Sequence, residues 1–226
     1  MKNIKNNNKG FTLAELVVIL VILSLLFAIL IPTVMGYIDE ARNKKYLPNA
    51  KSCLDAAQAM FSKQYGLNDV LPADTAVVSG SREQSKSANH DQDITTTKFA
   101  EDLLKLAGLP DGSPYLFMVG VGSAVDPVGT VRYGRTLTEA DKYTIYYAVY
   151  MEDANSKAWY YYNGSWSTRN PRYHKDSSIY DANNIIVSGP DKGIRIQYYL
   201  IANRHPTYKT SSVDNGKFWD WLRDMK

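Results

Sequence analysis

The strongest constraint on this chain is an apolar segment close to its N-terminus. Residues 16–38 contain no charged side chain, and Glu15 is the single charge between Lys9 and Asp39. As an α-helix, such a segment would extend for about 35 Å, since each residue adds about 1.5 Å. The apolar core of a bilayer is about 30 Å thick. The sequence therefore predicts a long helix whose first half, at about residues 11–36, is a transmembrane segment.

Two common interpretations of such a segment leave its acidic residue unexplained. A secretory signal peptide has a shorter apolar stretch that is followed by a cleavage site of small residues. A plain membrane anchor needs only length and apolarity. An uncompensated carboxylate inside a membrane helix costs about 2.5–3.5 kcal/mol, so it usually has a partner and a function. Alternatively, Glu15 reaches the membrane interface from the start of the helix and has no special role.

The residues around Glu15 resemble the class III signal of type IV pilins and pseudopilins. A leader with three lysines and no acid ends at Gly10, Phe11 follows, and Glu15 stands four residues after that Phe, before the apolar run. Ala14 departs from the pattern, because a branched aliphatic residue is commoner at that position. The resemblance covers residues 1 to about 40 and assigns no subfamily to the rest of the chain.

The resemblance implies cleavage between Gly10 and Phe11 by a membrane-embedded prepilin peptidase, which also N-methylates the new amine of Phe11. Gly10 suits this step, because a residue without Cβ lets the backbone enter a tight site in an extended form. In this family the carboxylate of Glu15 is thought to meet the N-terminal amine of a neighbouring subunit. Removing one partner of a buried ion pair costs about 3–5 kcal/mol. The resemblance thus implies that Glu15 sets the axial register of a filament.

Two residues of the apolar segment weaken a helix. Pro32 lacks an N–H and clashes with the carbonyl four residues earlier, and Gly36 has a low helix propensity. In a membrane this is tolerated where neighbouring groups satisfy the freed backbone. A kink without function is one interpretation. The resemblance favours the other, in which these positions soften the helix and let it melt locally as subunits pack.

Beyond the apolar segment the pattern changes from helical to strand-like. Helical spacing continues to about residue 65, and Pro48 indicates a kink or break. Short helices are predicted at residues 97–107 and 213–223. Alternating β-branched and aromatic residues predict strands, the last two of which form a hairpin, at residues 115–121, 143–151, 158–162, 184–188 and 194–201.

This order of elements predicts an α+β fold. It agrees with a type IV pilin-like arrangement, in which a long N-terminal helix with a transmembrane first half packs on an antiparallel β-sheet head. The expected organisation is a leader peptide at 1–10, a long helix at 11–65 and a globular α+β head at 66–226. Adjacent residues in a strand face opposite sides, so about half of the eight tyrosines on the predicted strands should face outward.

Composition excludes several other classes of protein. Cys53 is the single cysteine, which rules out a disulfide framework and a thiolate zinc site within one chain. The formal net charge of +3 makes nucleic acid a poor partner. The three histidines form no HExxH motif, and the chain has no GxSxG motif. We therefore expect no catalytic site, no metal, no cofactor and no enzyme.

The expected function is a structural subunit, major or minor, of a type IV pilus that serves adhesion, motility or related roles. Alternatives are a pseudopilin of a type II secretion or competence system, and a non-polymerising, membrane-anchored glycan-binding module. The implied partners are other pilins, prepilin peptidase, the assembly platform with its ATPase, and membrane lipid before assembly. Lysines flank the helix on both sides, so the cytoplasmic N-terminus of the single-pass precursor is inferred from the resemblance.

Overall fold

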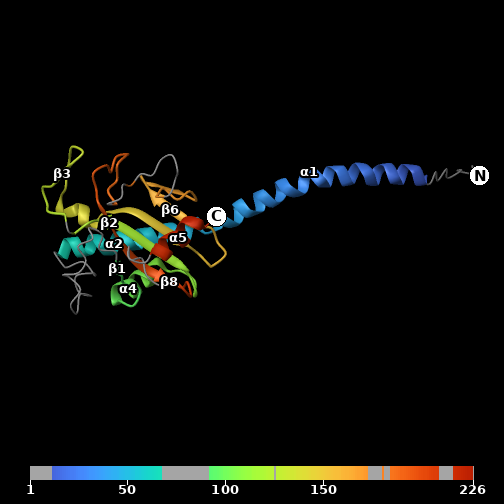
Figure 1. Ribbon diagram of the computed structural model, residues 1–226. Helices are drawn as coiled ribbons and strands as arrows, with labels where there is room; N and C mark the ends of the chain where they lie inside the picture. Colours follow the sequence, from blue (N-terminus) through green and yellow to red (C-terminus); the bar gives the residue numbers. More distant parts are fainter. Residues whose placement is uncertain are drawn as a thin grey trace, which may run out of the picture. The chain divides into compact units, whose positions relative to one another are not determined.

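A computed structural model describes the protein at residues 12–67, 92–124, 126–172, 180, 184–208 and 216–225, without the side chains at 30–37, 39, 42–43, 92–93 and 216. The chain divides into two units, Met1–Lys45 and Tyr46–Lys226. We call the second unit the head. Figure 1 shows the strands and helices of the head, coloured by their position in the sequence.

The described part of the first unit is the helix α1 (Leu13–Lys45) and Thr12 before it. Its apolar residues between Thr12 and Ile29 are exposed along the whole stretch. Among the residues that the structure describes, no helix combines the length and the apolar character needed to cross a membrane. The transmembrane segment predicted at about residues 11–36 includes positions whose side chains lie outside the described part, and it stays a prediction.

The predicted interruption near Pro48 is present. α1 ends at Lys45, Tyr46 forms a turn, and α2 (Leu47–Leu67) begins directly after it. Pro48 lies in the first turn of α2, where the missing N–H of a proline leaves no helical hydrogen bond unmade. The predicted long helix is therefore two helices, and α2 belongs to the same compact unit as the sheet.

The head is built on one sheet with the strand order β1-β8-β2-β5-β6-β7. Five of these strands pair antiparallel, and β1 adds a short parallel edge to β8. The strands are β1 (Gln92–Asp93), β2 (Leu116–Gly122), β5 (Ile145–Met151), β6 (Trp159–Tyr162), β7 (Ser165–Ser167) and β8 (Ile196–Asn203). The predicted α+β class with an antiparallel sheet is confirmed.

Most of the predicted elements of the head are present within one to three residues at each end. β2, β5, β6 and β8 match four of the predicted strands, and the short helices are α4 (Lys98–Ala107) and α5 (Gly216–Asp224). The predicted hairpin of 184–188 with 194–201 is present only over a short stretch. The backbone of Ile186 bonds to Gly193 and Ile194, and the Ile196 N–H donates to the Asn184 carbonyl at 2.9 Å. Along its length β8 pairs with β2 instead.

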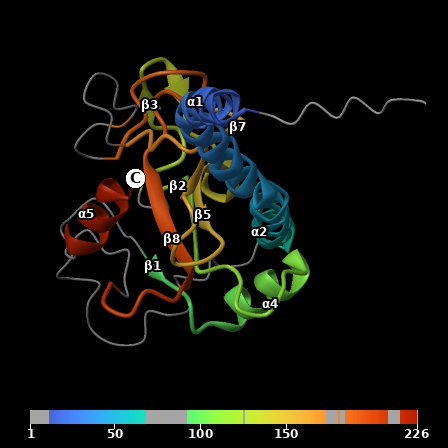
Figure 2. The ribbon, with the colours of Figure 1, turned by 90° about the vertical axis from the view of Figure 1, so that its right-hand side faces the viewer.

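The sheet is covered on both faces, as Figure 2 shows with α2 and α4 on one side and α5 on the other. On the first face, the small residues Ala50, Cys53 and Ala57 of α2 let the helix approach the strands closely. On the second face, α5 buries Phe218, Trp219 and Leu222. Successive residues of a central strand such as β2 therefore enter two different cores.

This double covering corrects the prediction for the tyrosines. Six of the eight on the strands are buried, and Tyr161 and Tyr162 are half-buried. The prediction of outward-facing tyrosines assumed one solvated face, which is common in antiparallel sheets. The C-terminal helix removes that face from solvent.

An excursion between β2 and β5 has no counterpart in the sequence prediction. It forms a small hairpin of β3 (Val131–Arg132) and β4 (Arg135–Thr136), followed by the 3-10 helix η1 (Glu139–Tyr143). Gly122 lets η1 approach the sheet, because a Cβ there would lie 2.7 Å from the carbonyl carbon of Asp141. This close approach places two carboxylates of the excursion beside the end of β2.

Candidate functional site

The start of α1 holds the acidic residue that the sequence analysis singles out. Thr12 precedes the helix, and its backbone N–H and its hydroxyl both donate to Oε2 of Glu15, at 2.8 and 2.7 Å. The Glu15 backbone N–H donates in return to the Thr12 hydroxyl oxygen at 3.2 Å. This reciprocal arrangement is a capping box, which satisfies donors that a helix start leaves free.

The capping box leaves one oxygen of the carboxylate unused. Both bonds from Thr12 fall on Oε2, and Oε1 of Glu15 has no hydrogen-bond partner among the described residues. Glu15 is exposed, as are its apolar neighbours Leu13 and Leu16. A cationic group could therefore reach Oε1 without breaking the cap.

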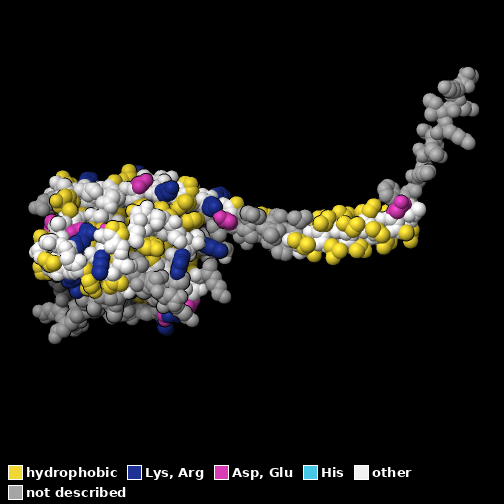
Figure 3. All heavy atoms as spheres, turned by 90° about the horizontal axis from the view of Figure 1, so that it is seen from above, with side chains coloured by type: hydrophobic (Ala, Val, Ile, Leu, Met, Phe, Trp, Pro, Cys, Tyr) yellow, Lys and Arg dark blue, Asp and Glu magenta, His cyan; other side chains and the backbone are white. Residues whose placement is uncertain are grey.

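The helix that follows presents a long apolar surface. From Leu16 to Phe27 each large aliphatic or aromatic side chain is at least 41% exposed, and Figure 3 shows hydrophobic side chains over most of the coloured surface of α1. Exposed apolar surface of this extent marks a protein–protein or membrane contact. The carboxylate thus stands at the start of a surface that needs a covering partner.

The other residues singled out by sequence are distributed differently. Gly10 and Phe11, the predicted cleavage and methylation positions, lie outside the described residues. Pro32 and Gly36 lie inside α1, which is assigned as helical without interruption from Leu13 to Lys45. The predicted softening at these two positions stays a prediction.

Thr12 is the functional neighbour that the sequence analysis missed. Its signal was available, because Thr12 and Glu15 form the pattern Thr-x-x-Glu directly before an apolar run, which is typical of a capping box.

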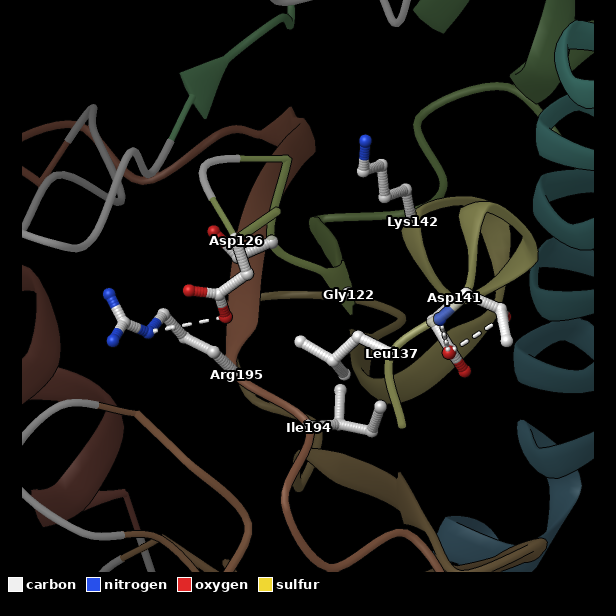
Figure 4. A pocket seen from close by; sticks show the side chains of 9 residues that line it. Gly122, Asp126, Leu137, Asp141, Lys142, Ile194 and Arg195 are labelled. Carbon is white, nitrogen blue, oxygen red and sulfur yellow. Dashed lines mark hydrogen bonds and ion pairs between the residues drawn. The ribbon is translucent and has the colours of Figure 1, made fainter. Parts of the chain in front are cut away.

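A second group of charged residues lies in the head, around a small cavity of about 10 Å³. On one side Asp126 is paired with Arg132 through two hydrogen bonds and with Arg195 at 3.5 Å. On the other side Asp141 pairs with Arg135 at 2.7 Å. Figure 4 shows Leu137 and Ile194 between the two carboxylates, and the side chain of Lys142 extending away from both.

The charged residues around this cavity stabilise the fold. Both carboxylates are buried and each is neutralised by an arginine, and the space between them holds about one water molecule. Burial opposes ionisation of Asp141, but hydrogen bonds from Tyr146, Thr138 and Arg135 outweigh it and lower its pKa to about 2. A carboxylate held ionised in this way anchors η1 to the hairpin. It is poorly suited to accept a proton near neutral pH.

The described part of the chain offers neither a reactive thiol at Cys53 nor a cluster of metal ligands. Burial raises the pKa of the Cys53 thiol far above its ordinary value, so the nucleophilic thiolate is suppressed. No group of three or more potential metal ligands occurs within the described residues. Cys53 acts as a small apolar side chain on the buried face of α2, as expected from the sequence.

Comparison with known protein families gives one match. The model described as the prokaryotic N-terminal methylation motif matches residues 5–31. Comparisons with the curated proteins and with the solved structures gave no match. The matched segment contains the predicted cleavage position, Glu15 and most of the apolar run, and it supports a type IV pilin-like or pseudopilin protein. The chain therefore carries the class III signal motif of type IV pilins and pseudopilins, and its arrangement of an N-terminal helix and an antiparallel sheet is like that of type IV pilins.

Proposed function

We propose that this protein is a structural subunit of a type IV pilus. Prepilin peptidase cleaves it between Gly10 and Phe11 and methylates the Phe11 amine, and the processed chain then polymerises into a surface filament. Before assembly the apolar part of α1 is held in the cytoplasmic membrane by lipid, with the N-terminus in the cytoplasm. The assembly platform and its ATPase move the subunit into the filament. In this role the protein is not an enzyme and needs no cofactor.

One observation carries the proposal, namely the match of the methylation motif to residues 5–31. The geometry of Glu15 supports it. Its carboxylate is fixed at the start of an exposed apolar helix, and one of its oxygens is open to a cation. Two opposite charges attract strongly where water is excluded. The methylated amine of another copy is a cation of the right kind, and pairing with it would fix the axial register between subunits.

Pro32 and Gly36 have a supporting role in this proposal. Both lie within α1, where a missing N–H and a residue of low helix propensity reduce the cost of local unwinding. We infer that they let the apolar helix adjust as it leaves lipid and packs against other helices in the filament.

The experiment that tests the proposal compares Glu15→Ala and Glu15→Gln with the wild-type chain. Glutamine also closes a capping box, so Glu15→Gln keeps the helix start and removes only the charge. Both variants should be processed normally at Gly10, and both should be absent from filaments sheared from cells. Glu101→Ala is the matched control, because Glu101 is an exposed acidic residue in the first turn of another helix. Wild-type amounts of Glu15→Gln in filaments would refute the role of the charge.

The same preparation separates the alternatives. A pilus subunit is recovered in long filaments from the cell surface. A pseudopilin of a secretion or competence system is processed at Gly10 but stays with the cell envelope. A membrane-anchored glycan-binding module that never polymerises keeps its leader and is absent from filaments.

A further inference from the structure

A tight turn follows the last strand of the sheet, and one histidine ring holds it closed. Nδ1 of His205 accepts hydrogen bonds from the backbone N–H groups of Thr207 and Tyr208, at 3.1 and 3.0 Å. Asn203 closes the same turn, since its side chain accepts from the His205 N–H at 3.0 Å and donates to the Tyr208 carbonyl at 2.6 Å. Residues 203–208 thus form a turn whose closure needs an acceptor at Nδ1.

The same ring connects this turn to the C-terminal helix. His205 stacks on Tyr208, with ring centroids 4.6 Å apart and planes inclined by 20°. The His205 ring also contacts Trp221 of α5, with ring centroids 4.5 Å apart. Tyr115 approaches the ring edge-on at 6.4 Å. The histidine therefore lies between the end of β8 and the helix that covers the second face of the sheet.

α5 has further contacts with the sheet among the described residues, including the Tyr198 and Trp219 rings, whose centroids are 5.0 Å apart. Phe218, Trp219 and Leu222 are buried against the strands, and the Tyr160 hydroxyl donates to the Leu222 carbonyl at 3.3 Å. Arg172 lies 4.2 Å above the Trp219 ring. A helix of nine residues is marginal alone, so its stability depends on these contacts.

We propose that His205 is a pH-sensitive lock for the C-terminal helix: the neutral ring holds the 203–208 turn against Trp221, and protonation in mildly acidic solution opens the turn and loosens α5 from the sheet. The physical reason is that a protonated imidazole carries an N–H on both nitrogens and has no acceptor left. Two backbone donors would then face a third donor. A histidine in water gains its proton near pH 6.5, so the change falls in a range that a cell-surface protein meets.

The ionisable groups on the described elements that contact the ring are compatible with this effect. They are the phenols of Tyr115 and Tyr208, Arg204 in the turn itself, and Lys217, Asp220, Arg223 and Asp224 on α5. Arg223 pairs with Asp220 at 2.8 Å and with Asp224 at 2.9 Å, so these carboxylates already have a cation. Burial raises the pKa of Tyr115, which keeps that phenol neutral.

One interaction opposes the lock. An imidazolium is attracted to aromatic faces, and Tyr208 and Trp221 both contact the ring. This attraction acts on the ring as a whole and does not restore an acceptor for the two amides. The proposal therefore predicts loss of protection on acidification, whereas dominance of the ring attraction predicts a gain.

The test is hydrogen exchange of the full chain in detergent micelles at pH 7.5 and 5.0, with rates corrected for the intrinsic effect of pH. Peptides covering 203–208 and α5 are followed. In the wild-type chain, protection of α5 should fall by about tenfold between pH 7.5 and pH 5.0. The limit is about thirtyfold, because a histidine exposed to water in the open form is half-protonated at about pH 6.5, which is about 1.5 pH units above 5.0.

Two variants isolate the acceptor. In His205→Asn the side-chain oxygen can accept from the same backbone N–H groups at any pH, so its protection should not change between the two pH values. His205→Phe keeps an aromatic ring but has no acceptor, and it should be as exposed at pH 7.5 as the wild-type chain is at pH 5.0. The double variant His90→Asn, His174→Asn controls for the other two histidines and should respond like wild type.

The outcomes decide the proposal independently of filament assembly. Wild-type protection that is unchanged or increased at pH 5.0 overturns it. A pH response in His205→Asn as large as that of wild type also overturns it, because that variant cannot titrate at this position. If His205→Phe fails to fold, the comparison of His205→Asn with wild type still decides.

Discussion

Thr12 and Glu15 form reciprocal hydrogen bonds across the first turn of α1, and only one oxygen of the Glu15 carboxylate takes part. Oε2 accepts from both donors of Thr12, while the Glu15 N–H returns a bond to the Thr12 hydroxyl. The proposed assembly contact therefore starts from a carboxylate that is already oriented. Its second oxygen, Oε1, has no hydrogen-bond partner among the described residues and can accept from a cationic group of another chain.

The hydroxyl of Thr12 should be measurable in the stability of the helix start. Thr12→Val keeps the shape of the side chain and removes the hydroxyl, and loss of an N-cap costs about 0.5–2 kcal/mol. We expect exchange of the amides in the first turn of α1 to rise by about two- to thirtyfold. Hydrogen exchange followed by mass spectrometry checks this, and Thr12→Ser is the control because it keeps the cap. Equal protection in Thr12→Val and wild type would show that the capping box contributes nothing.

The carboxylate of Asp141 makes the stability of the head depend on acid. Its pKa is lowered from 3.8 to about 2 in the folded chain, so its contribution is complete above about pH 4 and is lost as the pH falls from about 4 to 2. The shift corresponds to about 2 kcal/mol. Asp141→Asn should lower the free energy of unfolding by a similar amount at pH 6, and should show a smaller further loss than wild type between pH 4 and 2.

Urea unfolding of the head at pH 6, 4 and 2 measures this dependence. Asp111→Asn is the matched control, because Asp111 is exposed and lies outside the cavity. The explanation fails if wild type and Asp141→Asn lose the same stability over the acid range.

The glycine that lets η1 approach the sheet should not tolerate a side chain. In Gly122→Ala the added carbon would lie 2.7 Å from the carbonyl carbon of Asp141, and a backbone group cannot move aside cheaply. Overpacking of this kind costs about 1–3 kcal/mol. Gly66→Ala is the control, since Gly66 is helical and has no atom within 4 Å of such a carbon. Thermal unfolding should show a lower Tm for Gly122→Ala and an unchanged or higher Tm for the control.

The parts of the fold that were predictable depend on local patterns. α4 is bounded by signals that act within a few residues, because the Thr97 hydroxyl accepts from the Ala100 N–H and Gly108 adopts the left-handed conformation after the helix. The strands β2, β5, β6 and β8 are rich in β-branched and aromatic residues, which favours strands wherever they pair. The apolar segment of α1 is readable from length and composition alone.

The parts that were not predictable depend on contacts between distant segments. Residues 184–188 have strand-like composition, but they pair with 193–196 only over a short stretch, and most of β8 pairs with β2 and β1. The burial of the tyrosines follows from where α5 docks, which no local pattern encodes. The excursion between β2 and β5 is held by ion pairs such as Asp126 with Arg132 and Arg135 with Asp141, and sequence does not show which charges meet.

The functional residues, like the fold, include some that were predictable from the sequence and some that were not. Glu15 was identifiable because a carboxylate in an apolar run is expensive, and Thr12 was identifiable in principle from its spacing to Glu15. The lock proposed at His205 could not be predicted from the sequence. His205 and Trp221 lie far apart in the sequence, and only the folded chain brings their ring centroids to 4.5 Å.

The exact mass of the protein in purified surface filaments tests the whole interpretation most directly. If the chain is an assembled pilus subunit, intact-mass and N-terminal peptide analysis will find a polypeptide that begins at Phe11 and carries one added methyl group on its amine. A polypeptide that still begins at Met1, or its absence from filaments made by cells whose assembly machinery is active, would contradict that claim.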